Sequence, residues 1–190
     1  MNTANNILYV NACFRGDSRT NRLAKRVLET IDGRVETINL SDSIEPIKDE
    51  NFITFRNKAS ESKDFSNSAF LPALQFARAD TIVIAAPYWD MSFPAILKAY
   101  FEQINVIGVT FEYTDEGIPK GLCRANRLIY VTTAGGPIIS DEYGFGYVKI
   151  LAESFYGIKE VTQIKAEGLD IIGADVDSIL DDAFKKWKIK

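Results

Sequence analysis

The chain has 190 residues, of which 46% are hydrophobic and 25% are charged, and its formal net charge is -4. This length suits one well-cored globular domain, so we expect residues 1–190 to fold as a single domain. The negative charge argues against nucleic acid as a partner. No apolar stretch approaches the roughly 20 residues that cross a bilayer, so we expect no membrane partner either.

Cysteine and histidine usage narrows the possible chemistry. The two cysteines, Cys13 and Cys123, form no C-x-x-C motif and no disulfide framework, and we expect a cytoplasmic protein without a bound metal. No basic stretch precedes the first apolar run, which argues against a signal peptide. The chain has no histidine, so Ser-His-Asp and Cys-His catalysis are excluded. Any reaction must use carboxylates, a thiol, a hydroxyl or a cofactor.

Apolar, β-branched runs alternate with amphipathic segments along the chain. The runs predict strands at residues 7–12, 35–40, 81–86, 128–133 and 161–167, and the periodic segments predict helices at 19–31, 94–107, 146–156 and 175–188. Such alternation is typical of an α/β fold, a doubly wound parallel sheet of the flavodoxin-like type with strand order 2-1-3-4-5 and helices on both faces. The loops after strands 1, 3 and 4 would then meet at the carboxyl edge of the sheet, where ligands bind in such folds.

Two segments depart from the minimal pattern. Residues 41–75 are polar but carry four phenylalanines, and we expect one or two helices there, forming either part of a site wall or aromatic core contacts. Residues 109–121 predict an extended excursion with a D-E-G turn before the fourth strand.

The loop C-F-R-G-D-S-R-T at residues 13–20 follows the first strand and supports two hypotheses. As C-x5-R-T it matches the loop of low-molecular-weight cysteine phosphatases, with Cys13 as the nucleophile. As a polar loop opening a helix, carrying Arg15, Ser18, Arg19, Thr20 and Asn21, it predicts an anion site. The hydroxyls of Ser18 and Thr20 and an arginine would there join the backbone N–H groups and the helix dipole. Ser18 could instead serve only as an N-cap.

Two further loops suit a flat ring system. A-P-Y-W-D-M-S-F-P at residues 86–94 exposes adjacent aromatic side chains after a buried strand, or these aromatics pack on a neighbouring loop. T-T-A-G-G-P-I at residues 132–138 contains a Gly-Gly pair that permits close backbone approach to a ligand. A phosphate site, an aromatic wall and a glycine-rich floor together predict a bound mononucleotide.

Six motifs carry a resemblance over nearly the whole chain: S-R-T-N-R-L at 18–23, A-P-Y-W-D-M at 86–91, L-K-A-Y-F-E at 97–102, G-V-T-F-E-Y-T at 108–114, T-A-G-G at 133–136 and S-F-Y-G-I at 154–158. They resemble the FMN-dependent NADH azoreductase and NAD(P)H quinone reductase family of flavodoxin-like flavoproteins. The resemblance implies an FMN-dependent oxidoreductase that passes hydride by a ping-pong mechanism from NADH or NADPH to a small aromatic quinone or azo acceptor. It also implies a homodimer with the site at its interface, and no protein nucleophile.

The resemblance assigns site residues. The FMN phosphate would be bound by Ser18, Arg19 and Thr20, the isoalloxazine ring flanked by Pro87, Tyr88, Trp89, Asp90 and Met91, and its pyrimidine side faced by Thr133, Ala134, Gly135 and Gly136. The substrate pocket would contain Trp89, Phe155 and Tyr113, the last reaching into a partner's site. Trp89-Asp90 stands where the family has Tyr-Asn, which predicts an altered ring edge and acceptor preference. Ala134 stands where the family has an arginine, and Ala12 where it often has a serine, so one phosphate hydroxyl is missing.

Three alternatives accompany this interpretation. A cysteine phosphatase also needs a carboxylic acid to protonate its leaving group, and the chain lacks the Asp-Pro that supplies it in that family. A non-catalytic flavin electron carrier would normally be more acidic and would have a T-x-T-G-x-T loop, which is missing here. The third alternative is a flavin-binding sensor or regulator, which no feature of the sequence excludes.

Overall fold

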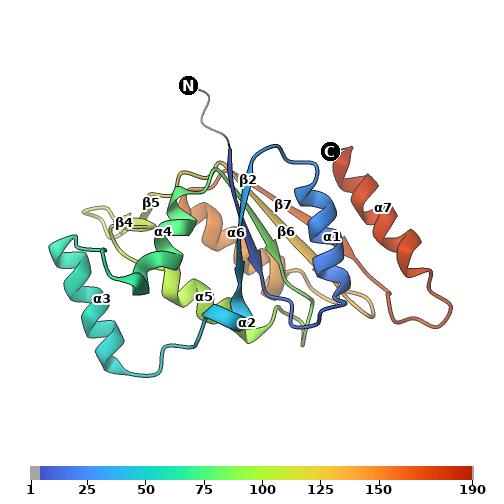
Figure 1. The fold of residues 1–190 in the computed structure, drawn as a ribbon, viewed down its shortest axis with the longest axis horizontal. Helices are drawn as coiled ribbons and strands as arrows, with labels where there is room; N and C mark the ends of the chain where they lie inside the picture. Colours follow the sequence, from blue (N-terminus) through green and yellow to red (C-terminus); the bar gives the residue numbers. More distant parts are fainter. Residues whose placement is uncertain (1–4, 190) are drawn as a thin grey trace.

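The computed structural model describes residues 5–189 (Figure 1). Its main sheet contains five parallel strands: β1 (Asn6–Asn11), β2 (Arg34–Asn39), β3 (Thr81–Ala85), β6 (Arg127–Thr133) and β7 (Glu160–Ala166). Their spatial order is β2-β1-β3-β6-β7, which confirms the predicted 2-1-3-4-5 order of the core strands.

Helices follow each strand of the sheet. They are α1 (Arg19–Leu28), α2 (Leu40–Ser43), α3 (Glu50–Ser62), α4 (Leu71–Arg78), α5 (Ala95–Ile104), α6 (Tyr147–Leu151) and α7 (Val176–Lys188). A 3-10 turn, Ser68–Phe70, precedes α4, and π-helical segments at Glu142–Gly146 and Ala152–Tyr156 flank α6. The 109–121 excursion is an antiparallel hairpin of β4 (Phe111–Tyr113) and β5 (Pro119–Gly121).

The sheet buries both of its faces, because successive side chains of a strand point in opposite directions. On one face Ile7, Tyr9 and Val83 pack against apolar residues of α1 and α7. On the other face Leu8 and Val10 join a larger core built with α4, α5 and the α6 region. Figure 1 shows α1 and α7 together on one side and the remaining helices on the other.

The pairing register of β1, β3 and β6 places the carboxyl ends of these three strands at the same level. Asn11 of β1 pairs with Ala85 of β3, and Ala85 pairs with Val131 of β6. The loops that follow these strands therefore emerge beside one another at the carboxyl edge.

Two local predictions needed correction. The segment 41–75 holds α2, α3, the 3-10 turn and the start of α4, more than the expected one or two helices. Its aromatic side chains pack together, with Phe55 stacked on Phe70 at 5.3 Å and Phe65 edge-on to Phe70 at 5.4 Å. The helix predicted from residue 146 begins earlier, at Glu142, and two glycines there had concealed its start because glycine has low helix propensity.

Candidate functional site

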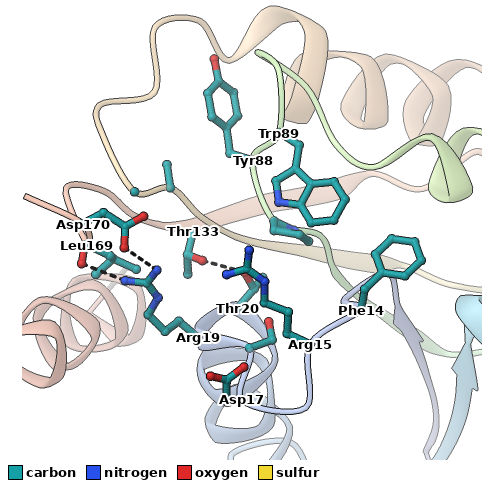
Figure 2. A pocket seen from close by; sticks show the side chains of 14 residues that line it. Phe14, Arg15, Asp17, Arg19, Thr20, Tyr88, Trp89, Thr133, Leu169 and Asp170 are labelled. Carbon is teal, nitrogen blue, oxygen red and sulfur yellow. Dashed lines mark hydrogen bonds and ion pairs between the residues drawn. The ribbon is translucent and has the colours of Figure 1, made fainter.

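A cavity of about 450 Å³ opens at the carboxyl edge of the sheet (Figure 2). Loops after β1, β3, β6 and β7 line it, with Phe14, Arg15, Asp17, Ser18, Arg19, Thr20, Pro87, Tyr88, Trp89, Thr133, Ala134, Gly135, Leu169 and Asp170. Its volume lies in the usual range for small-molecule and cofactor sites.

Most residues predicted to bind a cofactor lie in this lining: Ser18, Arg19, Thr20, Pro87, Tyr88, Trp89, Thr133, Ala134 and Gly135. Asp90, Met91 and Gly136 do not belong to it. The three predicted loops therefore meet around one cavity, with a polar end at the start of α1 and an aromatic end at Trp89.

The start of α1 combines a cap with free donors. Ser18 is the N-cap, and its Oγ accepts a hydrogen bond from the backbone N–H of Asn21 at 3.2 Å. The backbone N–H groups of Arg19 and Thr20 have no hydrogen-bond partner among residues 5–189. No acidic residue lies in the first turn of this helix, so its positive dipole end is not neutralised there.

The hydroxyl of Thr20 is engaged within the protein. Its Oγ1 lies 2.6 Å from Oγ1 of Thr133 in a buried hydrogen bond that ties α1 to the end of β6. Both residues are buried, so this bond forms the floor of the cavity rather than its open surface. Thr20 offers a ligand its backbone N–H and one remaining hydroxyl position.

Arg19 is also held by the protein. Its guanidinium donates to the Leu169 carbonyl at 2.8 Å and forms an ion pair with Asp170 at 2.6 Å (Figure 2). Asp170 is itself fixed over the glycine loop, since its backbone N–H donates to the Gly135 carbonyl at 2.8 Å. A Cβ on Gly135 would lie 2.1 Å from the Asp170 carboxylate, so a side chain at this position would displace that carboxylate from its place beside Arg19.

A tight turn after β3 presents Trp89 to the cavity. Trp89 and Ser92 exchange two backbone hydrogen bonds, at 2.9 and 2.8 Å, around Asp90 and Met91. Both central residues have positive φ, 48° and 68°, as in a type I′ turn. Left-handed backbone at a non-glycine residue is strained, and such strain concentrates at binding sites. The Trp89 ring stacks on Phe14 at 5.6 Å, so two exposed aromatics form one wall.

Cys13 does not belong to the lining of this cavity, although its neighbour Phe14 does. The thiol is buried and points at the Ala85 carbonyl, 3.8 Å away. Burial raises the pKa of the Cys13 thiol above its ordinary value, although hydrogen bonds with Ser18 and Asn21 act in the opposite direction. A phosphatase needs a thiolate with a lowered pKa and an arginine free to hold phosphate, so neither part of the C-x5-R-T hypothesis is favoured.

Tyr113 and Phe155 lie in a second cavity, of about 370 Å³, that shares no lining residue with the first. Phe111 links them, with ring centroids 5.3 Å from Tyr113 and 5.0 Å from Phe155. Residues of the 41–75 segment, such as Arg56, contribute to this second cavity and not to the first. Within one chain, Trp89 is therefore separate from the other two predicted substrate-pocket residues.

The residues assigned from the sequence leave out five residues of the first cavity, Phe14, Arg15, Asp17, Leu169 and Asp170, although Arg15 was counted in the predicted anion loop. Three belong to the loop already singled out after β1. The other two follow β7, whose loop pairs with the glycine loop after β6. The available signal was the strand order, because β7 lies beside β6 and its loop must emerge at the same edge.

Comparison with known proteins identifies the family. The family model described as a flavodoxin-like fold matches residues 5–190. An FMN-dependent NADH:quinone oxidoreductase of Clostridium beijerinckii is 37% identical over 195 residues, which cover 97% of this chain and 96% of that protein. The chain belongs to this oxidoreductase family. An FMN-dependent NADH:quinone oxidoreductase 2 of Clostridium acetobutylicum is likewise 37% identical, over 96% of each chain.

Solved structures agree with the oxidoreductase family. An FMN-dependent NADH-azoreductase from Bacillus anthracis, solved in complex with FMN, matches with a TM-score of 0.76 at 25% identity, covering 96% of this chain and 95% of that one. The family predicted from the motifs is thereby confirmed. No helix within residues 5–189 is long and apolar enough to cross a membrane.

The cavity fits the cofactor after which this oxidoreductase family is named. Unpaired N–H groups at the start of α1 suit a phosphate. Trp89, stacked on Phe14, supplies an aromatic wall for a planar ring at the other end, whereas the Tyr88 ring points away from the cavity toward Ser140. The backbone of Ala134 and Gly135 supplies a wall that a ring with polar edges could approach closely.

Proposed function

We propose that this chain is an FMN-dependent oxidoreductase that uses NADH to reduce quinones, with azo compounds as further acceptors. One observation carries the proposal: four loops converge on a single cavity with free anion-binding donors at one end and an aromatic wall at the other. A 37%-identical relative named for the same activity supports it. FMN, when bound, supplies hydride acceptance and donation, so no protein nucleophile is required.

The protein's own part is binding and orientation. We infer that Ser18 and the N–H groups of Arg19 and Thr20 bind the phosphate end of the cofactor. Trp89 would flank the ring, and the strained turn at Asp90 would fix the direction of the indole. Asp90, Met91 and Gly136 stand outside the lining and would act through the backbone shape of their loops.

The test is reconstitution. Purified apoprotein titrated with FMN should bind one equivalent and then oxidise NADH when benzoquinone is present. A phosphatase would instead hydrolyse p-nitrophenyl phosphate, and a carrier or sensor would bind flavin without steady turnover. Failure to bind FMN would refute the proposal, whichever acceptor is offered.

We also propose that the chain acts as a homodimer in which Tyr113 completes the site of the partner. The support is geometric: Tyr113 is 49% exposed on the β4–β5 hairpin and lies outside its own chain's cofactor cavity. An exposed aromatic that packs on Phe111 beside Phe155 suits an interface. Light scattering should give a mass near twice the 21.3 kDa of one chain.

Mixed subunits test whether Tyr113 acts across the dimer. Ala134→Trp would fill the cofactor cavity, and Tyr113→Ala would remove the ring that completes the acceptor pocket. In a heterodimer of the two variants, the Tyr113→Ala subunit keeps an intact cofactor cavity and the Ala134→Trp subunit keeps an intact Tyr113. Such a heterodimer has one complete site only if Tyr113 acts on the cavity of the partner subunit. Recovery of quinone reduction on mixing is expected, and no recovery would place Tyr113 in its own chain's site or outside any site.

A further inference from the structure

Arg15 differs from the arginines that follow it. Four arginines lie between Cys13 and Leu28, and three of them pair with aspartates of the segment after β7: Arg19 with Asp170, Arg22 with Asp177 and Arg26 with Asp181. Arg15 has neither an ion pair nor a side-chain hydrogen bond with any of residues 5–189, yet it lines the cofactor cavity.

Arg15 is exposed, and its side chain borders the cavity. In the view of Figure 2 the Arg15 side chain extends from the loop after β1 toward the space between Arg19 and Trp89. Asp17, the nearest acid along the loop, lines the same cavity but forms no ion pair with Arg15. An uncompensated guanidinium in a cavity is suited to bind an anion, because its planar N–H groups match two phosphate oxygens at once.

Arg19, by contrast, has its charge neutralised and its N–H groups directed at Leu169 and Asp170. To reach a phosphate it would have to leave both partners, and Asp170 would then repel the same phosphate. The backbone N–H of Arg19 stays available, but its side chain is committed to tying α1 to the loop after β7.

We propose that Arg15 is the cation that recognises the terminal phosphate of the flavin, and that Arg19 is a positioning residue that holds the β7 loop against the cavity. The inference rests on the proposed function, since it assumes that FMN is the ligand. It replaces the expectation that the Arg19 side chain binds the phosphate.

The diphosphate of the nicotinamide nucleotide has the same chemistry and is the other possible source of the anion. The flavin phosphate is favoured because the unpaired N–H groups of Arg19 and Thr20 border the same cavity as Arg15. Riboflavin lacks the phosphate but keeps the ring and ribityl chain, so a comparison of FMN with riboflavin isolates the phosphate contact.

The experiment measures dissociation constants of FMN and riboflavin for apoprotein by fluorescence titration. Loss of charge-assisted hydrogen bonds in Arg15→Gln should weaken FMN binding about 10- to 100-fold and riboflavin binding less than about threefold. Arg15→Lys should retain part of the preference for FMN, because it keeps the charge but loses the two-pronged geometry. Added salt should weaken FMN binding to the wild type more than to Arg15→Gln.

Two controls separate charge from position. Arg22→Gln removes the same charge seven residues further along the chain, within α1 and outside the cavity. It should leave the FMN-to-riboflavin ratio within about twofold, since its ion pair with Asp177 is exposed. The double variant Arg19→Gln/Asp170→Asn removes the ion pair at constant net charge. It should also preserve the ratio if the Arg19 side chain does not bind phosphate.

The opposite results would overturn the assignment. Equal weakening of FMN and riboflavin by Arg15→Gln would mean that Arg15 contacts the ring or ribityl chain. Unchanged FMN binding with a raised KM for NADH would assign Arg15 to the nicotinamide diphosphate. Loss of the preference for FMN over riboflavin in the Arg19→Gln/Asp170→Asn variant would mean that the Arg19 side chain binds the phosphate. Wild-type protein that binds neither flavin would refute the proposed function itself, and this inference with it.

Discussion

The buried Thr20–Thr133 hydroxyl pair allows a quantitative test of how the cavity floor is held. Thr20 is 1% and Thr133 is 7% exposed, and their hydroxyls lie 2.6 Å apart. Valine has nearly the same shape as threonine but no hydroxyl. Replacing either residue with valine therefore leaves the other hydroxyl buried without its partner. Replacing both removes the pair and leaves no stranded hydroxyl.

The magnitude follows from the desolvation penalty of a stranded polar group. Each single variant should lose about 1–3 kcal/mol of unfolding free energy. For a chain of this length that corresponds to a fall in Tm of roughly 2–12 °C. Thr20→Val/Thr133→Val should be nearly as stable as the wild type, so the two substitutions should couple by about 1–3 kcal/mol instead of adding.

The assay is urea unfolding of the apoprotein, followed by far-ultraviolet circular dichroism, with the slope m compared between variants to check two-state behaviour. Thr162→Val is a matched control, because the buried Thr162 hydroxyl has no hydrogen-bond partner among residues 5–189. Its removal should leave stability unchanged or raise it. Additive losses in the double variant, or single variants within about 0.5 kcal/mol of the wild type, would refute the reasoning.

Three further outcomes are expected. Cys13→Ser should keep NADH-dependent quinone reduction. Alkylation of the native Cys13 thiol should be slow at neutral pH and become faster only as the pH rises through its raised pKa. Loss of activity in the variant, or fast alkylation at pH 7, would contradict this expectation. Gly121→Ala would place a Cβ 2.2 Å from the backbone nitrogen of Gly157 and should lower Tm by roughly 2–12 °C, measured by scanning calorimetry, whereas an unchanged Tm would show that the hairpin is not packed there. In a Trp187→Phe variant Trp89 is the only tryptophan, so its fluorescence should be quenched on FMN binding, and constant emission at saturation would place the ring elsewhere.

The fold could be predicted from the sequence because the patterns that indicate strands and helices are local and recur along the chain. Continuous apolar runs such as 81–86 mark strands buried on both faces, and their alternation with amphipathic helices leaves few topologies to consider. The strand order then placed three loops at one edge. For the same reason the cavity lining contains most of the residues assigned to it, from Ser18 to Gly135.

The rest depended on contacts that no local pattern reveals. The pairing of Arg19 with Asp170 spans 151 residues, and the Thr20–Thr133 bond spans 113, so the side chains taken as free phosphate ligands were already engaged. That Arg15 lacks an ion pair among residues 5–189, while the following arginines have one, can be recognised only when the aspartates that pair with those arginines are known. The separation of Tyr113 from Trp89 likewise depends on where the hairpin packs, which residue spacing does not determine.

Anaerobic titration of the FMN-loaded protein tests whether the cavity carries out hydride transfer between two substrates. The account predicts that NADH bleaches the flavin absorption near about 450 nm and that one equivalent of benzoquinone restores it, with both half-reactions complete in the absence of the other substrate. A flavin that NADH leaves oxidised, or that quinone fails to reoxidise, would contradict the assignment of this chain as an NADH:quinone oxidoreductase.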